Sequence, residues 1–65
     1  MPISGKDMLK LFLKEGWIVL RQKGSHVVIE KGSEVEVIPM HRELSKGTEH
    51  DLKKRLRIEK EGKIQ

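Results

Sequence analysis

The first third of the chain carries hydrophobic residues at the spacing of an amphipathic helix. Apolar side chains recur there at i, i+3 and i+4, with lysines between them. The apolar set comprises Met8, Leu9, Leu11, Phe12 and Leu13. Ser4 followed three residues later by Asp7 resembles a capping box, so we expect the helix to begin at about Gly5. Gly16 is expected to close it, because glycine adopts the left-handed conformation common at helix ends.

After this helix the hydrophobic pattern changes its period. β-Branched residues gather in three short runs separated by two Gly-Ser pairs, which predicts three strands joined by tight turns. The expected strands comprise residues 17–23, 26–31 and 34–39. A two-residue first turn would place Lys23 opposite His26. The pattern therefore predicts a three-stranded antiparallel meander.

The length of the second loop decides which side chains of the third strand face the helices. A three-residue loop, Gly32-Ser33-Glu34, would place Val35 and Val37 on the same face as the apolar residues of the other strands. Those residues are Ile18, Leu20, Val27 and Ile29. A two-residue loop would turn Glu34 and Glu36 toward the helices and desolvate them, so we rank it second. With the three-residue loop, the opposite, open face carries Arg21, His26, Val28, Glu30 and Glu36.

A second helix is expected after a connector that contains Met40 and His41. Ser45 or Thr48 could cap this helix, which should run to about Arg57. The residues spaced for its one apolar face are Leu52 and Leu56, and its i, i+4 charge pairs are Glu49/Lys53 and Asp51/Arg55. Residues 59–65 are expected to fray. The whole pattern predicts one α+β domain over residues 1–65, with the order α-β-β-β-α and both helices on one face of the sheet.

Composition narrows the classes of partner. The chain has 65 residues, of which 35% are hydrophobic and 37% are charged, enough apolar residues for a thin core. Fourteen Lys and Arg residues against 10 Asp and Glu give a net charge of +4, which favours a polyanionic partner. There is no cysteine, so neither a disulfide nor a thiolate metal site is expected. The absence of a long apolar run leads us to expect a cytoplasmic protein without a signal peptide or membrane span.

Candidate chemistry centres on His26, which follows the first Gly-Ser pair and lies near Arg21 and Lys23. Histidine is the side chain that titrates near neutrality, and Arg and Lys bind phosphodiesters. RNA cleavage needs no protein nucleophile, because the 2′-hydroxyl can attack the adjacent phosphate once a base removes its proton. The three dispersed histidines lack metal-ligand spacing, so we predict no metal and no cofactor.

A second basic group stands on the predicted last helix and comprises Lys53, Lys54 and Arg55. Such a run is more often a solvated helix face than a binding site. The alternative is that these residues contact RNA. The chain would then have two candidate RNA-binding groups. The first comprises Arg21, Lys23, Gly24 and Ser25, and the second comprises Lys53, Lys54 and Arg55.

Several short motifs together resemble the HicA family of bacterial toxin mRNA interferases. They occur in the family's order between about Ile3 and Ile58, each of them weak alone. The motifs are Gly16-Trp17, Gly24-Ser25-His26, Pro39-x-His41, Glu43-Leu44 and Lys46-Gly47-Thr48. Two features depart from the family pattern: the polar stretch 48–51 in the last helix, and a sheet made acidic by three glutamates.

The resemblance implies a fold similar to a double-stranded-RNA-binding domain, cleavage of mRNA without a metal, and a HicB-like antitoxin that covers the histidine. By position it makes His26 the catalytic histidine, with Gly24 and Ser25 shaping the turn. For His41 we favour a hydrogen bond that fixes the connector over a direct catalytic role. His50 is assigned no function.

Two other classes of function stay open from the sequence. A non-catalytic RNA-binding module of the same fold would bind RNA and leave it intact. A scaffold that binds only a protein partner is the weaker third reading. Turnover of RNA separates the toxin from the module, and RNA binding separates both from the scaffold.

Overall fold

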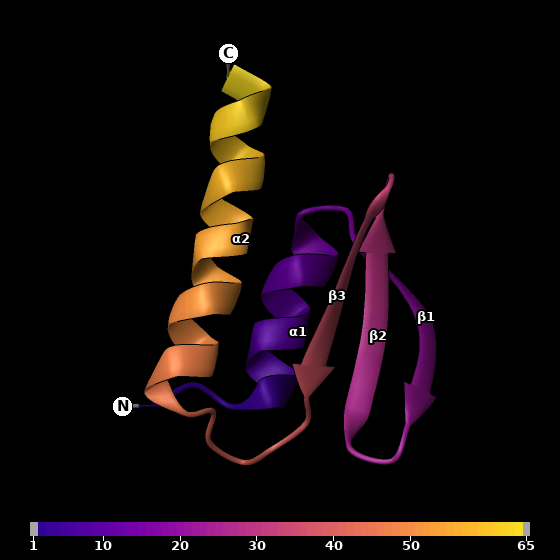
Figure 1. The fold of residues 1–65 in the computed structure, drawn as a ribbon, viewed down its shortest axis with the longest axis vertical. Coiled ribbons are helices and arrows are strands. Elements are labelled where there is room, and N and C mark those ends of the chain that lie inside the picture. The colour runs from indigo at the N-terminus through magenta and orange to yellow at the C-terminus, as the bar shows by residue number, and fades with distance from the viewer. Residues whose placement is uncertain (1, 65) are drawn as a thin grey trace.

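The computed structural model has the predicted order of helix, three strands and helix (Figure 1). It describes residues 2–64, and the side chains of residues 2–56. The elements are α1 (Gly5–Lys14), β1 (Ile18–Lys23), β2 (His26–Lys31), β3 (Glu34–Pro39) and α2 (Lys46–Ile64). The strands form one antiparallel sheet in the order β1-β2-β3, and both helices lie to one side of it (Figure 1). The predicted α+β class and topology are confirmed.

Helix α1 begins and ends where the sequence predicted. The side-chain oxygen of Ser4 accepts a hydrogen bond of 3.0 Å from the main-chain N–H of Asp7. At the other end Gly16 has a φ of +96°, which only glycine adopts without strain. The buried face is narrower than predicted, because Leu11 and Leu13 are 37% and 43% exposed. Only part of the apolar stripe therefore packs against the sheet.

One hydrophobic core joins the helices to the inner face of the sheet. Its buried residues are Met8, Phe12, Trp17, Val27, Ile29, Ile38, Leu44 and Leu52. The rings of Phe12 and Trp17 meet edge to face with their centroids 5.1 Å apart, a favourable geometry for aromatic pairs. The predicted apolar positions of α2 are also confirmed, because Leu52 is buried and Leu56 packs against the core.

The predicted register of β3 is wrong. Lys31 pairs with Glu34, so the second loop has only the two residues Gly32 and Ser33. Glu36 consequently lies opposite Ile29 on the inner face, and not on the open face as predicted. Val35 and Val37, which were predicted to join the core, lie on the open face and are 52% and 42% exposed.

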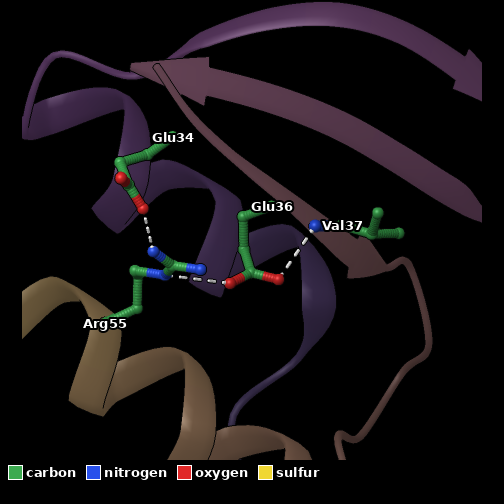
Figure 2. Close-up of polar contacts among 4 residues, drawn as sticks. All are labelled: Glu34, Glu36, Val37 and Arg55. Atoms are coloured by element: carbon green, nitrogen blue, oxygen red, sulfur yellow. Dashed lines mark hydrogen bonds and ion pairs between the residues drawn. The ribbon is translucent and has the colours of Figure 1, made fainter. Parts of the chain in front are cut away.

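Arg55 of α2 is the physical reason why the inner face tolerates two carboxylates. Its guanidinium donates to Glu34 and, over 3.2 Å, to Glu36 (Figure 2). Glu36 also accepts a hydrogen bond of 3.1 Å from the main-chain N–H of Val37. These groups lie at the margin of the core, where they are partly exposed. The cost of desolvation that argued against this register is therefore offset by a charge-assisted contact.

Strand β1 also departs from the predicted register. The pairing shifts between Val19 and Arg21, which leaves Leu20 at a β-bulge. Val19 therefore pairs with Ile29 on the inner face, and Ile18 pairs with Glu30 on the open face. The prediction that Ile18, Leu20, Val27 and Ile29 share one face is wrong, because the extra residue reverses the alternation.

Helix α2 is capped by Ser45, which settles the choice between Ser45 and Thr48. The Ser45 hydroxyl bonds to the hydroxyl of Thr48 at 3.0 Å and accepts from its main-chain N–H at 3.3 Å. The helix continues through Ile64, beyond the end predicted at about Arg57. Most residues of this last stretch have high helix propensity. The limits of a domain over residues 1–65 and the fraying of residues 59–65 stay predictions.

Candidate functional site

The candidate site lies at one end of the sheet. Strand β1 ends there, β2 begins, β3 ends, and α1 starts beside the connector to α2 (Figure 1). Segments far apart in the sequence are joined by two main-chain hydrogen bonds. The N–H of Met40 donates to the carbonyl of Ser25, and the N–H of Gly5 donates to the carbonyl of His41 over 2.9 Å. The first turn, the connector and the start of α1 therefore form one hydrogen-bonded unit.

His26 is the first residue of β2 and is exposed, as predicted. It pairs with Lys23 on one side and Pro39 on the other. The turn before it is tight because Gly24 has a φ of +59°, the left-handed value that the first position of a type II′ turn requires. This turn fixes the register that places His26 on the open face.

The open face of the sheet carries cations near the first turn and hydrophobic residues toward the other end, with Glu30 of β2 between Ile18 and Val35. Near the first turn, the exposed side chains of Arg21 and Lys23 share the face of His26. Toward the other end the same face carries Ile18, Val35 and Val37, all substantially exposed. The structure thus brings four predicted residues together, namely Arg21, Lys23, Ser25 and His26, with Gly24 forming the turn.

The imidazole of His41 lies beside that of His26. The ring centroids are 6.5 Å apart with an interplanar angle of 63°, and both residues are exposed. The connector is fixed by the main-chain carbonyl of His41, which accepts from Gly5. Within residues 2–56 the structure gives the His41 side chain no hydrogen bond, so a role of that side chain in fixing the connector stays a prediction.

Gly5 is a residue whose importance the sequence analysis missed. A Cβ atom at this position would lie 2.8 Å from Cα of Met40 and closer still to the carbonyl oxygen of Pro39. Such contacts are too short for any other residue, so glycine lets the start of α1 approach the connector. The sequence offered no signal for this, because Gly5 stands in an ordinary first helical turn and the contact is with residues more than thirty positions away.

The basic residues of α2 do not join this site. Lys53 pairs with Glu49 over 2.8 Å, and Arg55 is held between Glu34 and Glu36. Helix α2 lies on the covered side of the sheet, whereas His26 lies on the open side (Figure 1). Lys54 is exposed on α2. The i, i+4 spacing of Glu49 and Lys53 was the sequence signal for that pair.

Glu49 ties the N-terminal segment to α2. Its carboxylate accepts from Lys53 and, at 3.4 Å, from the main-chain N–H of Ile3. These hydrogen bonds, that of Lys53 first, hold the pKa of Glu49 below its ordinary value of 4.5. The ionised form of Glu49 is therefore the one that the fold stabilises.

The geometry is suited to proton transfer on a flexible polyanion. Two exposed imidazoles stand side by side, and two cations lie on the adjoining sheet surface. In the described part of the chain, no three His, Cys, Asp or Glu side chains converge as a group that could hold a metal ion. No helix within the described residues is long and apolar enough to cross a membrane.

Comparison with known protein families identifies a match over most of the chain. The family model of the HicA toxin of bacterial toxin-antitoxin systems matches residues 5–58, which is most of the chain. No curated protein and no solved structure matches the chain. The matched range includes every residue of the candidate site described above.

Proposed function

The chain belongs to the HicA family of bacterial toxins, and from that premise we propose that it is an mRNA endonuclease in which His26 transfers a proton without the help of a metal ion. The observation that carries this proposal is the position of His26: it is exposed on the open sheet face with Arg21 and Lys23 beside it. A phosphodiester bound by these cations would lie within reach of the imidazole.

The proposed reaction uses the substrate's own 2′-hydroxyl as the nucleophile. The 2′-oxygen bonds to phosphorus while the bond from phosphorus to the 5′-oxygen breaks. His26 either accepts the proton of the 2′-hydroxyl or donates one to the departing 5′-oxygen. Arg21 and Lys23 stabilise the negative charge that develops on the phosphoryl oxygens. The products are a 2′,3′-cyclic phosphate and a free 5′-hydroxyl.

The proposed partner is a HicB-like antitoxin that covers the open face. Ile18, Val35 and Val37 expose apolar surface further along the open face that carries His26. An antitoxin that buries this surface would gain hydrophobic stabilisation and would exclude RNA from the imidazole at the same time. Acidic residues on the antitoxin would complement Arg21 and Lys23.

The chemistry is tested by incubating the purified protein with mRNA in the presence of EDTA. We expect cleavage to persist, and we expect a 2′-deoxyribose at the scissile position to abolish it because the attacking hydroxyl is missing. Strict dependence on a divalent cation, or cleavage of the deoxy substrate, would overturn the mechanism.

Growth of producing cells separates the toxin from a non-catalytic RNA-binding module. Synthesis of the chain without an antitoxin should arrest growth and fragment the cellular mRNA, whereas a module would bind RNA and leave it intact. Both would show weaker RNA binding at higher salt, because contacts to phosphates release counterions. The state of the RNA, and not the affinity for it, therefore decides between them.

A further inference from the structure

The two neighbouring histidines are placed to perform two separate proton transfers. In-line transfer at phosphorus needs one proton taken from the attacking oxygen and one given to the leaving oxygen. These oxygens lie on opposite sides of the phosphorus atom, so a single imidazole is poorly placed to serve both at once. His26 has a second imidazole close by, that of His41, with 6.5 Å between the ring centroids.

From this geometry we propose that His41 is a second catalytic residue, which performs the proton transfer that His26 does not. The inference rests on the proposed ribonuclease function and extends it. One imidazole takes the proton of the 2′-hydroxyl as the 2′-oxygen bonds to phosphorus. The other, protonated beforehand, gives its proton to the 5′-oxygen as the bond from phosphorus to that oxygen breaks. Each proton lost is matched by one gained, and no other reactant is required.

The backbone holds His41 in place without using its side chain. Its carbonyl accepts from Gly5, and its neighbour Met40 donates to Ser25, the residue before His26. The main chains that carry the two histidines are therefore tied together. Both rings stay exposed, and within residues 2–56 neither imidazole has a hydrogen bond that would occupy its nitrogens.

The charged surroundings of the pair are also defined by the structure. Lys23 of β1 lies opposite His26 across the strand pair, and Arg21 lies further along the same face. Arg42 and Glu43 adjoin His41 in the connector and are exposed. A phosphate between the two rings would have cations on the sheet side, which favours its binding there.

The test compares His26→Ala, His41→Ala and His41→Asn on two RNA substrates. The first substrate is ordinary RNA, on which each variant should cleave about a hundredfold more slowly or worse, the usual range for a lost acid or base. The second has sulfur in place of the leaving 5′-oxygen. A thiolate leaves without a proton, so the variant that lacks the acid should regain activity while the variant that lacks the base should not. Circular dichroism and thermal unfolding of each variant check that the fold is retained.

The proposal is supported if the sulfur substrate restores cleavage by the variants at one histidine position and not at the other. The position at which cleavage is restored is then that of the acid, and the other is that of the base. Wild-type cleavage of ordinary RNA by His41→Ala would overturn the proposal, and so would slow cleavage by His41→Ala with no rescue at either position. The proposed function fails separately, if the wild type leaves RNA intact or if His26→Ala cleaves it at the wild-type rate.

Discussion

The guanidinium of Arg55 lies 3.2 Å from the carboxylate of Glu36 and joins α2 to β3 (Figure 2). The same side chain also pairs with Glu34. This contact stabilises the observed register of β3, because it satisfies two carboxylates that would otherwise be left unpaired at the edge of the core. It also engages the guanidinium of Arg55, one of the predicted RNA-binding residues, in two ion pairs.

Replacing Arg55 should therefore affect stability and leave RNA binding unchanged. We expect Arg55→Ala to lower the free energy of unfolding by about 1 kcal/mol, a modest value because the ion pairs are partly exposed and screened by water. Lys54→Ala is the matched control on the same helix and should change stability little. Denaturant unfolding measures the first effect and RNA affinity the second. A large loss of RNA affinity in Arg55→Ala with unchanged stability would contradict this role.

Gly5→Ala should disturb the candidate site from a distance. The added Cβ would collide with the main chain at Pro39 and Met40 and push the connector away from α1. We expect a loss of about 1–3 kcal/mol in stability, the range for forced overpacking, and slower RNA cleavage. The control is Gly47→Ala, whose Cβ would meet no atom within 4 Å. That substitution should be neutral or stabilise α2 slightly. Equal behaviour of the two variants would refute the close contact at Gly5.

Protonation of Glu49 should lower the free energy of unfolding in acid. Its pKa in the folded state is lowered from 4.5, so its contribution is present above pH 4.5 and is lost as the pH falls through the folded-state value. The free energy of unfolding of Glu49→Gln should consequently fall less steeply below pH 4.5 than that of the wild type. Lys53→Met, which removes the larger cause of the shift, should flatten the curve in the same direction. Superimposable pH profiles for all three proteins would show that the contact does not matter.

Val35 offers a test of the surface proposed for the antitoxin. Val35→Lys places a charge on the exposed apolar part of the open face and should weaken binding of the cognate antitoxin at least about tenfold, ~1.4 kcal/mol. Leu13→Lys is the matched control, since Leu13 is similarly exposed on α1, away from that face. Titration calorimetry measures both affinities. Weaker binding by Leu13→Lys alone would place the antitoxin on the helical side.

Local signals in the sequence were enough to predict the order of elements. The capping residues of α1, the first Gly-Ser turn and the exposure of His26 all follow from patterns a few residues long. The β3 register was missed because the prediction weighed only the desolvation of Glu34 and Glu36. Their partner Arg55 stands about twenty residues away, and no local pattern connects them.

In the candidate site, too, the residues close together in sequence could be predicted, and the contacts between distant segments could not. His26, Arg21 and Lys23 were predicted together because they flank one turn. The proximity of His41 depends on how the connector returns past that turn, through the contacts of Gly5 and Ser25. The bulge at Leu20 was also invisible, since one extra residue in a strand leaves hardly any mark on its composition.

The rate of RNA cleavage under single-turnover conditions tests most directly whether His26 is the catalyst. The comparison is between the wild type, His26→Ala, and His50→Ala, which removes an exposed histidine from α2. We predict a fall of about a hundredfold or more for His26→Ala and a wild-type rate for His50→Ala, with both variants folded and binding RNA. Cleavage by folded His26→Ala at the wild-type rate would contradict the account.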